Sequence, residues 1–504
     1  MRRWAHSIAP PLFLLAALGG CSRVEKGAET LSFAAPAGEI PIASASEDAR
    51  HHFAEGQAAM DAGRIQEANH HFEEAVAADP TFAYGYLNAA NTAASLEEFK
   101  TNLEAAEANA EMADEGVRIL IQMARKGLED DAEGQLELAN RLVQTYPSSP
   151  RAELALAGIQ SSLNQTADAR ASLAKAIELD PNFAPAYDAL RFSYTFSEPR
   201  DLAAAETNAR KVIELTPDES NAHENLGDVL RAQGRLEDAR TAYARASELD
   251  PTDGVPPLKM GHIDSFLGNY GEARTEYDRA IELARDGQKP SFANYKAFTS
   301  AYAGDTKATV NELGEVLASI DDMGIPADQA IGAKIFTLTN QALCALDAGM
   351  TDVAETALAE RARLLMIQAD EVGTPEFRSG QEANVAYWNG RLAVAKGDLE
   401  AAEASAAENA QLLEPSNNPR KMEAYHHLMG AIRLAQKNYP EAVEHLQQAN
   451  PADIYARYQL AVAQEGAGHA EEARRLFEYI ASYNFNNPGY ALVRNDAMRR
   501  IQGS

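Results

Sequence analysis

The sequence predicts an all-α fold built from repeated helix–turn–helix units. The clearest unit spans residues 221–251, where two helical stretches are joined at Gly234 and ended by Pro251. Glycine takes the positive φ of a tight turn without steric cost, and proline cannot continue a helix because it lacks an N–H donor. The second observation is that the same spacing of small, aromatic and proline residues returns along the chain.

Within this unit, Ala239 and Tyr243 lie one turn apart on the second helix, and the small Gly227 in the first helix allows close approach. Gly261 and Tyr277 repeat the pattern 34 residues later. A fixed period of this size is typical of stacked repeat proteins. Related spacings occur at Gly56, Gly63, Ala68, Phe72, Ala75 and Pro80, at Gly430, Ala442, Leu446 and Ala449, and at Leu460, Gly468, Ala473, Phe477 and Ile480.

This pattern resembles the tetratricopeptide repeat family, whose unit of about 34 residues has a W-x2-L-G-x2-Y…A-x3-F…P signature. The resemblance covers most of residues 49–487, although the family's tryptophan is missing from every clear copy. It implies a helix–turn–helix solenoid, wound as a right-handed superhelix. It also implies that the first helix of each pair lines a concave groove, which in this family binds peptides or proteins.

Residues 1–20 have the features of a secretory signal peptide. Arg2 and Arg3 precede an apolar run that is too short to span a membrane as a helix. Residues 18–21, LGGC, resemble the bacterial lipobox, which implies cleavage before Cys21 and lipidation of this cysteine. We therefore expect a lipid-anchored protein of the bacterial envelope, in the outer membrane and facing the periplasm. An ordinary signal peptide with a coincidental cysteine is the alternative.

The remaining elements follow in order. Residues 21–46 are rich in small and polar residues and are predicted to form the lipidated cysteine and a flexible tether. Helices are expected from 47, in a repeat array over 47–487 that is degenerate at 83–149 and 291–415. Residues 488–504 are predicted to be a capping helix, because the last repeat otherwise exposes its stacking face.

The composition and the absence of known motifs limit the classes of function that we expect for this chain. The formal charge of −30 makes the chain a poor non-specific binder of nucleic acid or anionic lipid. No phosphate-binding loop, H-E-x-x-H zinc motif or G-x-S-x-G nucleophile motif is present. We therefore expect no enzyme activity, no catalytic residues and no cofactor.

The resemblance also transfers groove positions onto this chain. They mix aromatic, amide and charged side chains, which suit an extended peptide or a helix. The alternative for each residue is that it only solvates the concave face or packs between repeats. Arg231 and the neighbouring Asn225 do not reproduce the basic set with which some family members hold a C-terminal carboxylate. The expected groove residues are Asn221, Glu224, Asp228, Arg231, His262, Phe266, Tyr387, Arg391, His427, Tyr455 and Tyr458.

Histidine pairs occur at 51–52 and 70–71, on the two facing helices of the first repeat, with Glu74 nearby. Imidazoles on facing helices can bind zinc, but adjacent histidines point about 100° apart on a helix, so only one of each pair can join a shared site. His426 and His427 with His445 make a weaker set. We expect solvated or capping histidines at all these positions and no metal.

The leading hypothesis is a non-enzymatic envelope scaffold whose groove binds a peptide or protein partner to assemble a complex. Two alternatives remain open. One is an assembly or secretion factor for an exported polysaccharide. The other is an enzyme with a site in the degenerate repeats.

Overall fold

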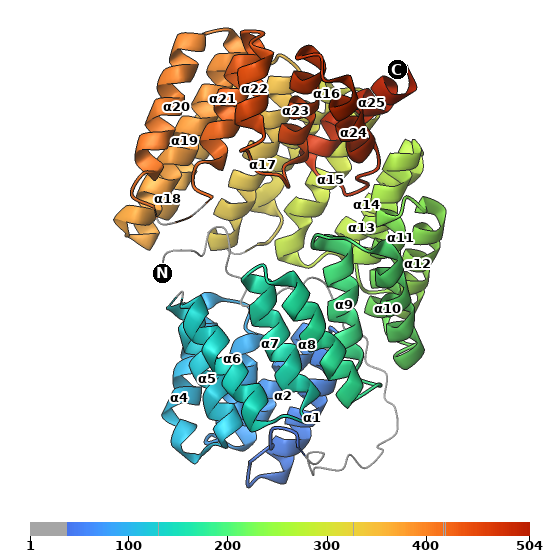
Figure 1. Cartoon of the computed structure of the whole chain (residues 1–504), viewed down its shortest axis with the longest axis vertical. Helices are drawn as coiled ribbons and strands as arrows, with labels where there is room; N and C mark the ends of the chain where they lie inside the picture. Colours follow the sequence, from blue (N-terminus) through green and yellow to red (C-terminus); the bar gives the residue numbers. More distant parts are fainter. Residues whose placement is uncertain (1–37, 130, 326, 417, 419, 504) are drawn as a thin grey trace. The chain divides into compact units, whose positions relative to one another are not determined.

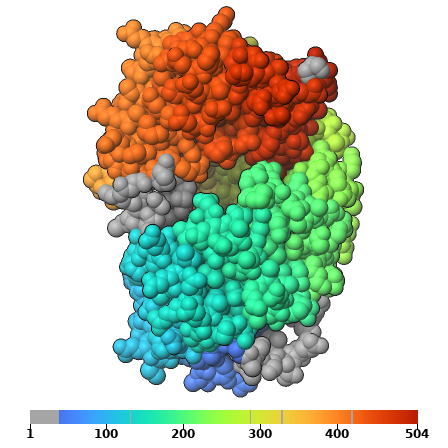
Figure 2. Space-filling view, viewed as in Figure 1, coloured from blue at the N-terminus to red at the C-terminus, as the bar shows by residue number. Residues whose placement is uncertain are grey.

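The structure is a computed structural model that describes residues 38–503, except for residues 130, 326, 417 and 419. Every regular element in these described residues is a helix, which confirms the predicted all-α class (Figure 1). The chain divides into two compact units, with the division between residues 256 and 257. Figure 2 shows the same chain from the same side with its atoms drawn as spheres.

Unit 1 is a stack of antiparallel helix pairs in which each helix contacts the next along the chain. A short 3₁₀ helix, Ala110–Met112, precedes its third pair. The α-helices are α1 Glu47–Asp61, α2 Ile65–Ala78, α3 Ala83–Asn91, α4 Leu96–Ala108, α5 Glu115–Leu128, α6 Ala132–Thr145, α7 Pro150–Ser162, α8 Thr166–Leu179, α9 Ala184–Phe196, α10 Leu202–Leu215, α11 Ser220–Ala232 and α12 Leu236–Leu249.

Unit 2 continues the same alternation and ends on a single helix. Short 3₁₀ helices lie at Asp286–Gln288 and Ile320–Asp322. The α-helices are α13 Val255–Leu267, which begins just before the division, α14 Tyr270–Leu283, α15 Lys289–Tyr302, α16 Thr306–Ser319, α17 Ala327–Asp347, α18 Thr351–Val372, α19 Pro375–Lys396, α20 Leu399–Leu413, α21 Glu423–Ala435, α22 Tyr439–Leu446, α23 Ile454–Gly466, α24 Ala470–Ala481 and α25 Pro488–Gln502.

In four pairs, a glycine in the first helix is required by a large residue 16 positions later in the second. A Cβ atom added at Gly227 would lie 2.4 Å from Cε1 of Tyr243, whose side chain is fully buried. The same contact joins Gly56 to Phe72, Gly261 to Tyr277 and Gly430 to Leu446. The turn glycine Gly234 has φ 77°, as the helix–turn–helix prediction requires. The recurring spacing therefore records how the two helices of a pair interlock.

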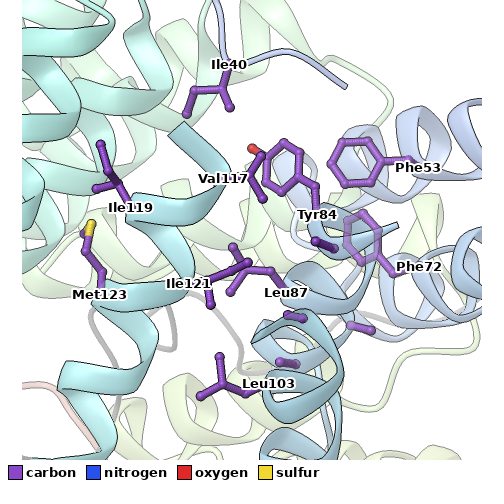
Figure 3. Close-up of a cluster of buried hydrophobic side chains, with 14 of the residues drawn as sticks. Ile40, Phe53, Phe72, Tyr84, Leu87, Leu103, Val117, Ile119, Ile121 and Met123 are labelled. Carbon is purple, nitrogen blue, oxygen red and sulfur yellow. The ribbon is translucent and has the colours of Figure 1, made fainter. Parts of the chain in front are cut away.

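The core of unit 1 is built from these interlocked side chains (Figure 3). The Phe53 ring lies 5.5 Å from Phe72 and 4.7 Å from Tyr84 between ring centroids. Ile119 and Met123 of α5 extend the same buried cluster. Full burial of a side chain of this size contributes roughly 1.5–3 kcal/mol, so stacking of neighbouring pairs supplies the stability that a single pair lacks.

The poorly phased segments are still helix pairs. Residues 83–149 form α3–α6, and residues 291–415 fall within α15–α20 and the loop that follows α20. Helices α17, α18 and α19 contain 21, 22 and 22 residues, against 13 in α11. In the second segment the landmarks lose their phase because these three helices are longer. Cys344 of α17 is fully buried, and burial raises the pKa of its thiol.

The last part of the expected tether belongs to the packed body. Ile40 is buried and Ile42 packs against the unit 1 core. The Ser149 hydroxyl donates a hydrogen bond of 2.6 Å to Glu39. The tether expectation is therefore wrong for residues 38–46, because their two isoleucines bury apolar surface. Cys21 and residues 22–37 lie outside the described residues.

Helix α25 packs on α23 and α24, as a capping helix would, and it also packs against α15 and α17. The C-terminal segment, which we define as residues 483–502, therefore contacts helices that precede it by well over a hundred residues. Some of the expected groove residues are among the residues that this segment contacts.

Candidate functional site

The expected groove residues all lie on the first helices of their pairs. Asn221, Glu224, Asp228 and Arg231 are on α11 of unit 1, and the other seven are on α13, α19, α21 and α23 of unit 2. The structure brings four of these together, shows that three contact the C-terminal segment, and places the four residues of unit 1 in internal packing.

In unit 1 the α11 residues pair with their own neighbours. Asp228 accepts hydrogen bonds from the Tyr243 hydroxyl at 2.8 Å and from Nη2 of Arg231 at 2.9 Å. A Cβ atom at Gly63, in the α1–α2 turn, would lie 2.1 Å from the amide nitrogen of Asn221. Glu224 is 3% exposed. These contacts hold α11 in the array and leave little of its polar surface for a ligand.

His262 and Phe266 are covered by the C-terminal segment of the same unit. The Asn486 side-chain amide lies 3.1 Å from Nδ1 of His262 and donates to the Tyr277 hydroxyl at 3.1 Å. The guanidinium of Arg494 lies 5.6 Å from the centroid of the Phe266 ring. The chain itself therefore occupies this part of the wall. The contact joins residues 224 positions apart, so repeat spacing alone contains no signal for it.

The remaining wall of unit 2, which we call the Arg391 wall, consists of Tyr387, Arg391, His427 and Tyr455. The Arg391 guanidinium carbon lies 5.8 Å from the Tyr387 ring centroid and 5.3 Å from that of Tyr455. The Tyr387 hydroxyl is 2.9 Å from Nδ1 of His427. The helices α19, α21 and α23 thus place one cation in a frame of tyrosines, where each cation–π contact is worth about 0.5–2 kcal/mol.

The electrostatics of this wall keep most of its titratable groups neutral. Burial lowers the pKa of His427 well below its usual range, and Asp453 opposes this only in part. Nε2 of His427 lies 2.9 Å from the oxygen Oε1 of Gln459, so the ring proton is assigned to Nε2 and Nδ1 accepts from Tyr387. Burial raises the pKa of Tyr455 to about 12. Arg391 is therefore the positive charge of the wall at neutral pH.

A second arginine stands beside the first. The Arg361 and Arg391 guanidinium carbons lie 5.6 Å and 4.7 Å from the Trp388 ring. Arg361 donates to the side-chain oxygens of Thr339 and Asn384 at 2.7 Å and 2.8 Å. Neither arginine has a carboxylate within 4.0 Å among the described residues. Burial lowers the pKa of Arg361 to about 10. Sequence reasoning missed Arg361 and Trp388 because it considered only the groove positions of the first helices.

Tyr458 belongs to a separate contact with α25. Its hydroxyl donates to Oδ2 of Asp496 at 2.6 Å, and Arg499 donates to Oδ1 at 2.9 Å. Partial burial opposes ionisation of Asp496, but the hydrogen bonds from Tyr458, Arg500 and Arg499 outweigh it and lower the pKa to about 2. Tyr458 therefore anchors α25 to α23.

We expect unit 2 to lose stability as the pH falls from about 4 to about 2. An unfolded aspartate titrates near 3.9, so the contribution of Asp496 is complete above that pH and is lost as the pH falls through about 2. Urea unfolding between pH 5 and pH 2 tests this. Asp496→Asn should show a shallower loss over this window. Glu471→Gln, at an 87% exposed side chain of the same unit, should keep the wild-type profile. An unchanged profile in Asp496→Asn would contradict the assignment.

The sequence of the chain also matches models of known protein families. Three family models, each described as a tetratricopeptide repeat, match five segments of the chain: residues 53–116 and 195–254, residues 433–495, and residues 153–183 and 258–286. The matches lie in both units, and the match over residues 433–495 runs past the predicted end of the array at 487 into α25. The fold is thus an all-α solenoid of tetratricopeptide-type helix pairs.

Several solved structures are similar to parts of the chain. One is the crystal structure of MamA, with 22% identity and a TM-score of 0.29 over 32% of this chain and 93% of its own. YrrB, described as a TPR protein with an unusual peptide-binding site, has 21% identity and a TM-score of 0.29 over 40% and 98%. PilW, a type IV pilus biogenesis factor, has 15% identity and a TM-score of 0.35 over 42% and 96%. No curated protein matches the sequence.

Among the described residues, none of the helices is both long enough and apolar enough to pass through a bilayer.

Proposed function

We propose that this chain is a lipid-anchored scaffold of the bacterial envelope, in which the Arg391 wall of unit 2 binds a segment of a protein partner. The observation that carries this proposal is the pair of arginines around Trp388, neither of which has a carboxylate within the 4.0 Å of an ion pair among the described residues, although Asp453 and Asp347 act on Arg391 from farther away. A buried cation without such a partner favours binding of a carboxylate from outside. The tetratricopeptide-type fold supports a binding role of this kind.

The chemistry of the wall suggests what the segment contains. Tyr387 and Tyr455 offer aromatic area that costs little conformational entropy on binding. Arg391 offers N–H donors to an acidic side chain, a terminal carboxylate or backbone carbonyl oxygens. The strongly acidic body of the protein disfavours a long acidic partner. We therefore propose an extended segment with one carboxylate placed at Arg391 and apolar groups on either side.

Affinity purification of the lipidated protein from detergent-solubilised native envelopes tests the binding site. A specific partner should be retained by wild type and fall at least about 10-fold in Arg391→Gln, because a hydrogen bond to a charged group contributes about 1.5–3 kcal/mol. Arg363→Gln is the matched control, since Arg363 is 59% exposed on α18 and pairs with Glu360. Equal recovery from all three proteins would refute binding at the Arg391 wall.

The same preparation tests the anchor. We propose that Cys21 carries the lipid, so Cys21→Ala should move the protein from the membrane fraction to the soluble fraction. Multiple acyl chains hold a protein on a membrane stably, whereas the body alone has no such attachment. A Cys21→Ala protein that stays with the membrane would overturn the lipid anchor while leaving the proposal for the Arg391 wall intact.

A further inference from the structure

Helices α1 and α2 of unit 1 carry the same short sequence on their facing sides. His52 and Glu55 on α1, and His71 and Glu74 on α2, are each three residues apart and so share one helix face. Each histidine is followed directly by a fully buried phenylalanine of the core (Figure 3). These phenylalanines determine how both helices are rotated, and the two His-x-x-Glu faces meet as a result.

The donor atoms of this cluster have the spacing of a metal-ligand set. Nδ1 of His52 lies 3.0 Å from Oε2 of Glu74 and 3.7 Å from Oε2 of Glu55. Nδ1 of His71 lies 3.4 Å from Oε2 of Glu55. Zinc bonds of about 2.0–2.2 Å in a tetrahedron separate the ligand atoms by about 3.3–3.6 Å. The three observed separations bracket this range.

The two inward nitrogens are buried without a hydrogen-bond partner among the described residues. This holds for Nδ1 of His52 and Nδ1 of His71, although carboxylate oxygens lie close to both. These oxygens lie outside hydrogen-bonding geometry. Leaving a buried polar atom unpaired costs free energy, so such atoms are rare unless a ligand uses them. The expectation of solvated or capping histidines is therefore wrong for these two atoms.

We propose that α1 and α2 bind one divalent transition-metal ion, with Zn²⁺ as the best fit, through His52 Nδ1, His71 Nδ1 and the Glu55 carboxylate, whose donor atoms all lie within 4.8 Å of one another. The Glu74 carboxylate, next to His52, would close in as the fourth ligand. Two neutral imidazoles and two carboxylates balance the charge of the ion. Mixed nitrogen and oxygen donors at tetrahedral spacing suit zinc, whereas calcium and magnesium prefer sets of oxygen ligands. The ion would clamp the two helices at the start of the array.

The outer histidines complete the arrangement. Nε2 of His51 lies 3.4 Å from Oε1 of Glu55, and Nε2 of His70 lies 3.4 Å from Oε1 of Glu74. Each outer ring thus lies beside the carboxylate oxygen that does not face the site. Such contacts to the far side of a ligand orient it and strengthen metal binding.

The other histidine cluster, formed by His426 and His445, differs because its Nδ1 atoms already have a hydrogen-bond partner. Nδ1 of His426 and Nδ1 of His445 lie 3.0 Å apart and bond to each other. The Nδ1 atoms of this pair are therefore already used, and the pair serves as an internal comparison within the same molecule.

Zinc titration of the full chain, without a polyhistidine tag and after treatment with a chelator, tests the proposal. Calorimetry should give one equivalent of tightly bound Zn²⁺, which raises the melting temperature of the wild type. His52→Gln and His71→Gln should each weaken binding at least about 100-fold, more than the 10–100-fold typical of residues that only support a ligand. His223→Gln, on α11 of the same unit, should bind as the wild type does.

Cobalt(II) in place of zinc reports the geometry directly. A tetrahedral site gives intense visible absorption, whereas an ion held mainly by water in octahedral geometry gives a weak band. Strong absorption in the wild type that disappears in His52→Gln supports the site. Weak absorption, binding that survives both glutamine variants, or loss of binding only in His445→Gln would overturn it. Circular dichroism of each variant separates lost binding from lost folding.

Discussion

The Gly227→Ala variant is expected to lose about 2–4 kcal/mol of folding stability. The new methyl group would lie 2.4 Å from Cε1 and 2.6 Å from Cδ1 of Tyr243, a rigid ring that is fully buried. Tyr243 would have to move, and its 2.8 Å hydrogen bond to Asp228 would be strained or lost. Overpacking costs typically 1–3 kcal/mol, and the charge-assisted hydrogen bond adds to this. Urea unfolding followed by circular dichroism measures the loss.

Two further variants test whether the clash between the added methyl group and the Tyr243 ring causes this loss of stability. Gly380→Ala changes an exposed helical glycine with nothing within 4 Å of the added Cβ, and it should raise stability by about 0.5–1 kcal/mol. The double variant Gly227→Ala/Tyr243→Ala should lose less than the sum of its single variants, because the ring that obstructs the methyl group is gone. Simple additivity, or a neutral Gly227→Ala, would show that helix interlock is not what this glycine provides.

Asp188→Ala should cost unit 1 about 3–5 kcal/mol. Asp188 pairs with Arg191 through two bonds, of 2.7 Å from Nε and 3.1 Å from Nη2, and Asn225 donates to it at 3.0 Å. The Arg191 side chain is only 3% exposed. Removal of the carboxylate leaves a buried charge without compensation, which is the costly way to break such a pair. The change in urea midpoint checks the size of the effect.

Two controls test whether the cost of Asp188→Ala comes from the burial of the charged Arg191 side chain and not from loss of an ion pair alone. Glu178→Ala breaks a pair with Lys175 in which the side chains are 68% and 50% exposed, and it should cost less than about 1 kcal/mol. The variant Asp188→Leu/Arg191→Met removes both partners and should be more stable than Asp188→Ala. A loss below about 1 kcal/mol in Asp188→Ala would contradict the interpretation that these two groups depend on each other.

The fold was predictable because the repeated residues are those that pack against each other within one helix pair. Gly227 and Tyr243 are separated by only 16 residues, and their contact is made within one helix pair, so it recurs wherever that pair recurs. The prediction weakened at α17–α19, where helices of 21 and 22 residues move the landmarks out of phase. Burial of Ile40 and partial burial of Ile42 were also missed, because two isoleucines in a short segment outside the repeats carry no periodic signal.

The sites were predictable only in part. Repeat spacing placed Tyr387, Arg391, His427 and Tyr455 on one wall. It could not show that Asn486 reaches His262, since a contact across 224 residues depends on how many pairs stack before the chain returns. In the first repeat the sequence showed paired histidines on facing helices, but the rotation set by the buried core decided which ring of each pair turns inward.

The sequence by itself therefore determined the helix pairs, their turns and their interlocking residues, because these depend on contacts between near neighbours in the chain. Only the tertiary structure decided which polar groups are satisfied within the chain and which are left for a ligand. Satisfaction of a buried donor or acceptor depends on distance and angle to groups that stacking brings together. This is why Arg361, Glu55 and the C-terminal segment entered the description only once the helices were in place.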